Sequence, residues 1–296
     1  LGGQGVGEAA DRLLYGEVNP SGRLAETFPV KLEDNPSYLN FPGDGLNVDY
    51  AEGVYVGYRY YDTKKMPVRW AFGHGLSYTT YEYSNLKMPS ETLGDEGSVK
   101  VSVDVKNTGS LAGKEVVQLY VSDKNGTAGR PVKELKGFSK VALAPGETKT
   151  VEFTLTARDL SFYHEGLSDW YAPSGTYEVL VGHASDEIAL KGELSFQTAK
   201  RPPLYVSGST TLGELMAHPV TAPIVGQMMQ SMQEKMGSMM GGDAEENANP
   251  LGTDAAMMEA MMKGMPLKSL ASFAGAEAAA QIEQMMSALN QALGNV

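Results

Sequence analysis

Acidic and amide side chains gather in one loop near residue 50 and are the first candidates for chemistry. Their spacing does not match the ligand pattern of an EF-hand calcium loop. Such a loop could instead place hydrogen-bond acceptors and tyrosines at the rim of a sugar-binding cleft, or it could be a solvated structural loop. The residues concerned are Asp44, Asn47, Asp49, Glu52, Tyr50 and Tyr55.

Histidine chemistry is not favoured by the spacing of this residue type. The four histidines, His74, His164, His183 and His218, are far apart, and none forms an i, i+4 pair. The pattern therefore argues against a helical zinc site and against a Ser–His–Asp arrangement. We expect His74, which lies between two glycines, to be a packed turn residue.

Glycines and tryptophans give two further candidates. Gly3, Gly5 and Gly7 do not form the G-x-G-x-x-G motif, and no Walker lysine follows, so a tight turn into a helix is expected rather than a nucleotide site. Trp70 and Trp170 could each offer a flat face to a pyranose ring. Packing in a core or at a domain interface is the more common role of such side chains.

Composition limits the classes of protein and partner. The chain has 296 residues, of which 42% are hydrophobic and 20% charged, which is typical of about two globular domains. Its formal net charge of −12 argues against nucleic acid and anionic membranes as partners. With no cysteine, it has neither a disulfide framework nor a thiolate metal site, and the compartment is left open.

The first 94 residues contain the helix, strand and chain-breaking signals of an α/β domain. An apolar face over residues 5–16 predicts a short helix, with Glu8 in its first turn and Gly16 after its end. Residues 24–30 are expected to form a short strand, and the aromatic and β-branched stretch 54–61 is also strand-like. We therefore interpret residues 1–94 as the closing edge of an α/β domain whose bulk lies upstream.

A period of two residues begins near residue 97. Val99, Val101, Val103 and Val105 alternate with polar residues, which predicts a strand with one buried face. Further strands are expected at 115–121, 151–155 and 177–182, with a turn at 143–147. Short strands at this spacing predict a β-sandwich over residues 95–199.

Residues 200–296 are rich in methionine and poor in aromatic side chains. Helices are expected at 221–240, 253–264 and 275–293, with a flexible linker between the first two. The methionines fit adaptable helix packing best. A methionine metal cluster and an amphipathic surface-binding tail are the alternatives.

Several motifs in this order resemble the C-terminal portion of family-three glycoside hydrolases, the β-glucosidase-like enzymes. The strand motifs at 107–109, 115–121, 130–138 and 159–162 are similar to the fibronectin type III-like domain of that family. The resemblance covers residues 2–199, and the Met-rich tail is similar to tails of some bacterial members. The N-terminal motifs that carry it are Gly2-Gly3-Gln4, Gly7-Glu8-Ala9-Ala10-Asp11, Gly16-Glu17-Val18-Asn19-Pro20-Ser21-Gly22-Arg23-Leu24, Thr27-Phe28-Pro29, Glu52-Gly53-Val54-Tyr55-Val56-Gly57-Tyr58-Arg59-Tyr60-Tyr61-Asp62 and Phe72-Gly73-His74-Gly75-Leu76-Ser77-Tyr78-Thr79.

The resemblance implies a mixed fold and a retaining glycosidase as the parent protein. The fold is the edge of an α/β sandwich domain, an immunoglobulin- or fibronectin III-like β-sandwich and a helical Met-rich tail. Such enzymes use two carboxyl groups about 5–5.5 Å apart. In this family the Asp nucleophile comes from an N-terminal barrel, and the Glu acid/base usually comes from the α/β domain before residue 1. Neither Glu8 nor Glu17 falls on the acid/base motif.

We therefore assign no catalytic, substrate-binding or metal residue and no cofactor to the chain, and we expect it to be inactive alone. The implied partners are a β-linked glucoside or oligosaccharide and the missing barrel and α/β domains. The alternatives are a non-catalytic β-sandwich that binds carbohydrate or a partner, and a protein that acts through its Met-rich helices. The discriminating feature is residues 1–80, since a free-standing module has no use for the edge of an α/β domain.

Overall fold

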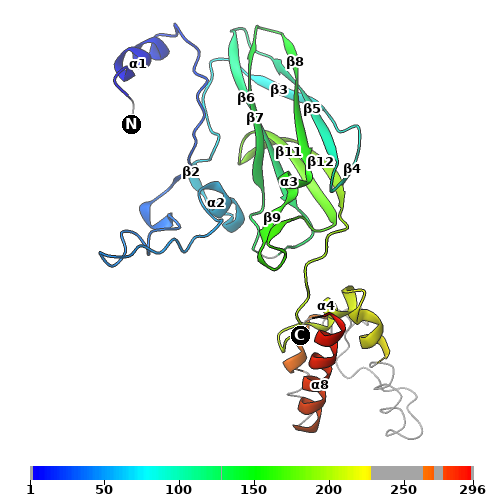
Figure 1. Cartoon of the computed structure of the whole chain (residues 1–296). Helices are drawn as coiled ribbons and strands as arrows, with labels where there is room; N and C mark the ends of the chain where they lie inside the picture. Colours follow the sequence, from blue (N-terminus) through cyan, green and yellow to red (C-terminus); the bar gives the residue numbers. More distant parts are fainter. Residues whose placement is uncertain (1–2, 128, 228–262, 270–275, 295–296) are drawn as a thin grey trace, which may run out of the picture. The chain divides into compact units, whose positions relative to one another are not determined.

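The computed structural model describes residues 3–127, 129–227, 263–269 and 276–294 (Figure 1). The chain forms two compact units, Leu1–Arg201 and Pro202–Val296. The first unit holds a β-sandwich and, N-terminal to it, a segment with little regular structure. The second unit is helical in the part that the structure describes.

The β-sandwich consists of a five-stranded and a three-stranded sheet. The five-stranded sheet has the order β4-β12-β11-β6-β7, and the three-stranded sheet has the order β3-β5-β8. All neighbouring strands are antiparallel except β12 and β4. The strands are β3 (Tyr81–Lys87), β4 (Thr92–Gly94), β5 (Ser98–Asn107), β6 (Gly113–Asp123), β7 (Glu134–Leu143), β8 (Thr148–Thr156), β11 (Gly175–Ala184) and β12 (Glu187–Gln197).

The alternation in β5 reaches the core as predicted. Val99, Val101, Val103 and Val105 are at most 2% exposed. They pack with side chains of the facing sheet in one apolar cluster. The predicted strands at 115–121, 151–155 and 177–182 lie in β6, β8 and β11. Since β3 pairs with β5, the three-stranded sheet also includes residues N-terminal to position 95.

A short helix and a small hairpin connect strands β8 and β11 of the sandwich. The helix α3 (Ala157–Leu160) has a capping box formed by Thr156 and Asp159. It leads into a hairpin of β9 (Phe162–His164) and β10 (Asp169–Tyr171), joined by the 3₁₀ turn η2 (Glu165–Leu167). In the turn expected at 143–147, the backbone N–H of Ala144 donates to the carboxylate of Glu147 over 2.7 Å.

The N-terminal segment contains short elements only. These are α1 (Val6–Leu14), β1 (Phe28–Pro29), η1 (Leu32–Asp34), α2 (Tyr58–Lys64) and β2 (Val68–Trp70). The helix expected at 5–16 is confirmed as α1, and Gly16 follows its C-cap with a φ of 76°. The strand expected at 24–30 is confined to β1, which pairs with β2.

The strand-like prediction for 54–61 was wrong, because this stretch leads into helix α2. Gly57, with a φ of 59°, is the N-cap residue of this helix. Helical spacing then places Tyr58 and Tyr61 on one buried face, where they are 8% and 3% exposed. Tertiary packing of two tyrosines thus overrides the strand propensity of the sequence.

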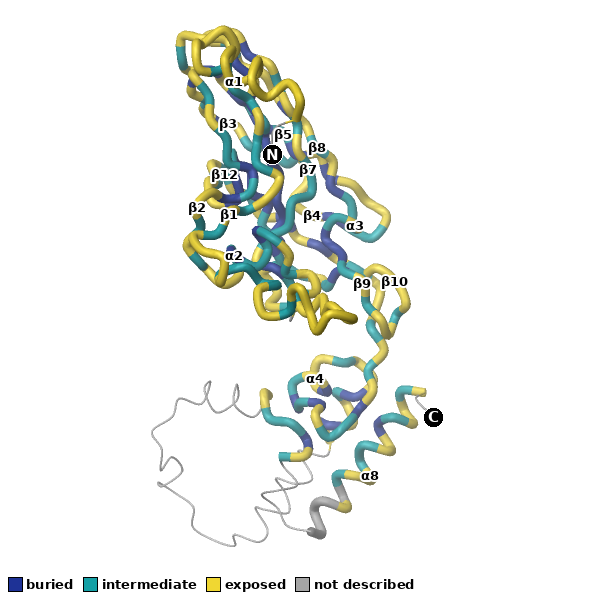
Figure 2. Tube along the Cα trace, turned by 90° about the vertical axis from the view of Figure 1, so that its left-hand side faces the viewer, coloured by how far each residue is buried: buried dark blue, intermediate teal, exposed yellow. Residues whose placement is uncertain are grey.

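Many apolar side chains of the N-terminal segment are exposed, in contrast to the sandwich core (Figure 2). No residue of α1 is buried. An apolar surface of this extent usually marks an interaction site. The most exposed large apolar residues of the segment are Leu14, Tyr15, Leu32, Leu39, Phe41, Leu46 and Tyr50.

The second unit has an apolar core of its own. Helix α4 (Leu212–Ala217) begins with a capping box of Thr211 and Glu214, residues 221–227 are helical, and α8 (Ala276–Ala292) lies within the helix expected at 275–293. Most of the helices expected at 221–240 and 253–264 lies outside the described residues. None of the described helices is long and apolar enough to cross a membrane. The buried core residues are Val206, Leu212, Leu215, Val225, Leu267 and Leu289, with Met285 and Met286 packed against them.

Candidate functional site

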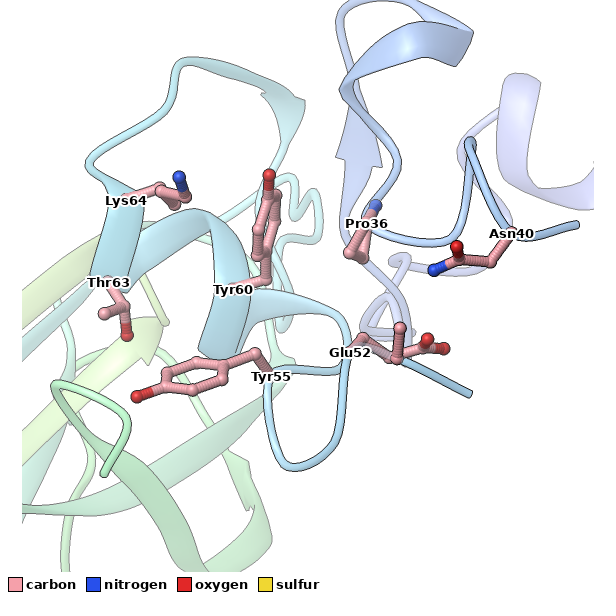
Figure 3. A pocket seen from close by; sticks show the side chains of 8 residues that line it. Pro36, Asn40, Glu52, Tyr55, Tyr60, Thr63 and Lys64 are labelled. Carbon is pink, nitrogen blue, oxygen red and sulfur yellow. The ribbon is translucent and has the colours of Figure 1, made fainter. Parts of the chain in front are cut away.

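A pocket of about 320 Å³ lies between helix α2 and the loop that precedes it (Figure 3). In this view the ring of Tyr60 rises from α2 beside Lys64, while Glu52 and Asn40 occupy the other side. Aromatic, charged, amide, hydroxyl and small apolar side chains meet here. The lining residues are Pro36, Asn40, Ala51, Glu52, Tyr55, Tyr60, Thr63 and Lys64.

Helix α2 is held against strand β7 and the loop before it. The backbone N–H of Leu135 donates to the Tyr58 hydroxyl over 2.7 Å. Lys133 Nζ lies 2.9 Å from a carboxylate oxygen of Asp62. Contacts from two turns of α2 therefore fix the helix that forms one wall of the pocket.

The two tyrosine rings of the pocket are held by their neighbours. The Tyr55 hydroxyl donates to the carbonyl of Arg130 over 3.4 Å, and the backbone N–H of Tyr55 donates to the carbonyl of Glu52 over 2.9 Å. The Tyr60 ring meets the buried ring of Tyr61 edge-on, with centroids 5.4 Å apart. The aromatic walls are therefore ordered before any ligand arrives.

Some polar side chains of the pocket already make hydrogen bonds within the protein, and others do not. The Thr63 hydroxyl donates to the carbonyl of Arg59 over 2.6 Å and accepts the N–H of Val132 over 3.1 Å, so it has a structural role. Lys64 Nζ lies 5.9 Å from the centroid of the Tyr60 ring. Glu52 Oε2 is buried and has no hydrogen-bond partner among the described residues.

The structure brings only part of the predicted loop to the pocket. Glu52 and Tyr55 line it. Asp44 instead accepts the N–H groups of Leu46 and Asn47 over 3.0 and 2.8 Å, and these bonds lower the pKa of its carboxyl group. Tyr50 is 85% exposed, and like Asp44, Asn47 and Asp49 it does not line the pocket.

A second polar cluster surrounds Glu115, a residue that the sequence did not single out. Glu115 is fully buried, and its carboxylate lies 2.5 Å from Arg23 Nη2 and 2.8 Å from His183 Nδ1. The hydroxyl of Tyr83 donates to it over 2.8 Å. Burial and the charge of Glu115 together raise the pKa of Tyr83, which keeps this hydroxyl protonated as a donor.

A signal for this cluster is present in the sequence. Glu115 occupies the same phase of β6 as Val117 and Leu119, both of which are fully buried. A charged residue at a core-facing position needs a partner, because an unpaired buried charge is very unfavourable. Its partner Arg23 belongs to the motif at 16–24, one of the motifs that carry the resemblance in the sequence.

Gln118, on the same strand as Glu115, also holds the N-terminal segment. Its side-chain amide donates to the carbonyl of Gly73 over 3.2 Å and to the carbonyl of His183 over 2.5 Å. The Tyr120 hydroxyl donates to the amide oxygen of Gln118 over 2.5 Å. Gly73 has a φ of 83°, and a Cβ at this position would overlap the Gln118 amide. A larger residue would therefore displace the Gln118 amide from its hydrogen bonds.

The four histidines occupy different surroundings. His74 lies in a turn, as expected, with its N–H donating to the carbonyl of Ala71 over 3.1 Å. Although His74 and His183 are far apart in the sequence, they line the same cavity of about 250 Å³. His164 belongs to β9, and His218 follows α4. Among the described residues no group of histidine and acidic side chains has the arrangement of a metal site.

The tryptophans and the two N-terminal glutamates are partly or fully exposed. Trp170 is 39% exposed, but the guanidinium of Arg158 lies 3.1 Å from its ring centroid and occupies one face. Trp70 is 43% exposed and meets Phe28 edge-on. Glu17 pairs with Arg12 over 3.4 Å, and Glu8 lies in the first turn of α1.

Family models match two segments of the chain, one N-terminal to the β-sandwich and one within it. Residues 1–78 match the glycosyl hydrolase family 3 C-terminal domain, and residues 115–185 match the fibronectin type III-like domain. The thermostable β-glucosidase B of Acetivibrio thermocellus is 43% identical over 296 residues, which are 100% of this chain and 37% of that protein. The chain belongs to glycoside hydrolase family 3.

Other relatives and solved structures show how far the similarity extends. An exo-α-(1→6)-L-arabinopyranosidase of Bifidobacterium breve is 37% identical over 96% of this chain and 35% of its own length. The crystal structure of a Bifidobacterium adolescentis GH3 β-glucosidase superimposes with a TM-score of 0.67 at 37% identity, covering 75% of this chain and 32% of that chain. The β-glucosidase of Kluyveromyces marxianus in complex with glucose gives 0.60 at 45% identity, covering 65% and 23%.

The chain spans at most little more than a third of the length of these relatives. Within it, Arg23 lies in the segment that matches the family 3 C-terminal domain, and Glu115 lies in the fibronectin type III-like domain. The buried cluster around Glu115 therefore joins the two parts of the family 3 architecture that this chain contains.

Proposed function

We propose that the chain is the C-terminal part of a retaining β-glucosidase-like glycoside hydrolase, in which it serves as scaffold and rim of the substrate cleft. The identity to β-glucosidases across the full chain length carries this proposal. Its substrates would be β-linked glucosides or oligosaccharides. The arabinopyranosidase among the relatives is the reason to test glycosides with other sugars as well.

The two carboxyl groups that cleave the bond would come from the barrel and α/β domains of the parent enzyme. Retaining cleavage requires a nucleophilic carboxylate and a second carboxyl group about 5–5.5 Å away. The most deeply buried glutamate described here, Glu115, is engaged by Arg23, His183 and Tyr83. A carboxylate that is fully paired in this way suits a structural role better than nucleophilic attack.

The exposed apolar side chains of the N-terminal segment would pack against those domains. Leu39 and Leu46 are 92% and 94% exposed in this chain. Covering such surface contributes about 25 cal/mol for each Å² removed from water. The Glu115 cluster would then transmit the rigidity of the sandwich to the segment at the interface.

The Met-rich residues of the second unit would form a helical tail that packs through adaptable side chains. Met285 and Met286 pack against the core of this unit. Methionine fills irregular gaps because its side chain is unbranched and flexible. Deleting residues 205–296 from the parent enzyme should therefore lower its stability or change its oligomeric state.

A β-sandwich that only binds carbohydrate is less well supported. Its clearest candidate platform, the ring of Trp170, has one face covered by Arg158. The proposal is tested by following the anomeric configuration of the sugar that the complete polypeptide releases from an aryl β-glucoside, using NMR. We expect the configuration to be retained, and inversion would refute the assignment of a retaining enzyme.

A further inference from the structure

We propose that the pocket beside α2 binds one pyranose ring of a neutral sugar through Tyr55, Tyr60, Glu52, Asn40 and Lys64. This inference rests on the proposed function, because it identifies carbohydrate as the ligand of a site within a carbohydrate-active protein. None of the residues is assigned a role in bond cleavage. The pocket would hold part of the sugar chain.

The aromatic walls suit one face of a sugar ring. A pyranose presents C–H groups on its faces and hydroxyl groups around its edge, so an aromatic ring can cover a face while polar groups reach the edge. Tyr55 is held by Arg130 and Tyr60 by Tyr61, as described above. Because both rings are already ordered, binding loses little side-chain entropy.

The polar side chains suit the edge of the ring. Among the described residues, Glu52 and Lys64 form no ion pair, and no hydrogen bond engages the side-chain amide of Asn40. A carboxylate accepts, an ammonium group donates, and an amide does both, which matches hydroxyl groups that do both. Glu52 Oε2 in particular is buried without a partner, which is unfavourable until a donor arrives.

Charge and size narrow the class of ligand. One acidic and one basic side chain face the pocket, so neither an anion nor a cation is favoured. The volume of about 320 Å³ lies at the lower end of the range of about 300–1,000 Å³ that small-molecule sites occupy. The pocket therefore fits one sugar ring, with further rings of an oligosaccharide extending into solvent.

Titration of the chain of residues 1–296 with methyl β-glucoside tests this inference, with two-dimensional amide NMR as the readout. We expect saturable shifts confined to amides of residues 36–64, with a Kd on the order of 1 mM. Cellobiose should bind within about threefold of the monosaccharide, since its second ring lies outside the pocket. Glycerol, which has hydroxyl groups but no ring face, should bind at least about tenfold more weakly.

Variants distinguish the pocket from general surface binding. Tyr60→Ala should weaken binding at least about tenfold, and Glu52→Gln, which preserves the shape of the side chain, about threefold or more. Tyr50→Ala and Glu33→Gln are the matched controls, since both residues are exposed and neither lines the pocket. The controls should leave the Kd unchanged within about twofold.

Two results would overturn the inference. Shifts that stay linear up to ~50 mM sugar would mean that the pocket does not bind this sugar specifically. An equal loss of affinity in the Tyr50→Ala control would place the binding elsewhere. Failure of this test with retained configuration in the complete enzyme would refute only the sugar pocket, whereas inversion would refute the proposed function whatever the titration shows.

Discussion

Arg23 Nη2 lies 2.5 Å from the carboxylate of Glu115, and this pair joins the family 3 C-terminal segment to the β-sandwich. The glutamate side chain is fully buried, and that of Arg23 is 12% exposed. His183 and Tyr83 complete the hydrogen bonds of the carboxylate. Loss of any one of its three partners would leave this buried carboxylate incompletely paired, which is unfavourable, so the cluster should couple the folding of the two segments.

Replacing Arg23 should be much more costly than breaking an exposed ion pair. Arg23→Met leaves the Glu115 carboxylate buried without its strongest partner, and we expect a loss of about 3 kcal/mol in the free energy of unfolding of the first unit. Lys100→Met, which removes the exposed pair with Glu152, should cost less than about 1 kcal/mol. Urea unfolding monitored by tryptophan fluorescence measures both. Equal effects would show that the Glu115 cluster does not stabilise the unit.

A side chain at position 73 should destabilise the protein more than a side chain at position 16. Both have a positive φ, but a Cβ on Gly73 would overlap Gln118, whereas nothing surrounds the Cβ position of Gly16. Gly73→Ala should cost about 3 kcal/mol and Gly16→Ala about 1 to 2 kcal/mol. Gly22→Ala, at a position with open space and no positive φ, is the neutral control. A Gly73→Ala protein as stable as the Gly22→Ala protein would contradict the packing described here.

Acid should destabilise the first unit partly through Glu134. Burial raises the pKa of this carboxyl group, but Lys136, Arg130 and Arg59 outweigh burial and hold the pKa below its ordinary value of 4.5. A lowered pKa contributes stability above the unfolded value, and this contribution is lost as the pH falls through the folded value. The free energy of unfolding should therefore fall from about pH 5 downward, and Glu134→Gln should make this fall shallower. An unchanged slope in the variant would refute the assignment.

The exposed leucines Leu39 and Leu46 should promote self-association of the chain without affecting its folding. Leu39→Ser and Leu46→Ser change side chains that are more than nine-tenths exposed. The free energy of unfolding should therefore stay within about 0.5 kcal/mol of that of the unsubstituted 296-residue chain. Self-association, measured by analytical ultracentrifugation, should decrease because the apolar surface is smaller. Loss of stability in either variant would show that these side chains are packed in solution.

The sequence predicted the elements that depend on local patterning. The alternation of Val99 to Val105 located β5, and the apolar face before Gly16 located α1. It failed at residues 54–61, where aromatic residues of high strand propensity form the start of a helix. The reason is tertiary, since the helix buries both Tyr58 and Tyr61 and packs Tyr58 against Tyr120 and Leu180 of the sandwich.

The candidate site was only partly predictable for the same reason. Glu52 and Tyr55 were recognised because acceptors and tyrosines share one loop. A strand at 54–61 does not place Tyr60 beside Glu52 and Lys64, because strand and helix direct side chains differently. The pairing of Arg23 with Glu115 spans 92 positions and has no local signal beyond a charge in the buried phase of β6.

The most direct test of the whole account is an assay of the isolated chain on an aryl β-glucoside. We predict that the purified 296-residue protein releases the phenol no faster than buffer does, because it supplies the scaffold of a glycosidase and not the two carboxyl groups that break the bond. Turnover that disappears when one aspartate or glutamate of this chain is changed to its amide, with a glycosyl group attached to that residue in the unchanged protein, would contradict the account.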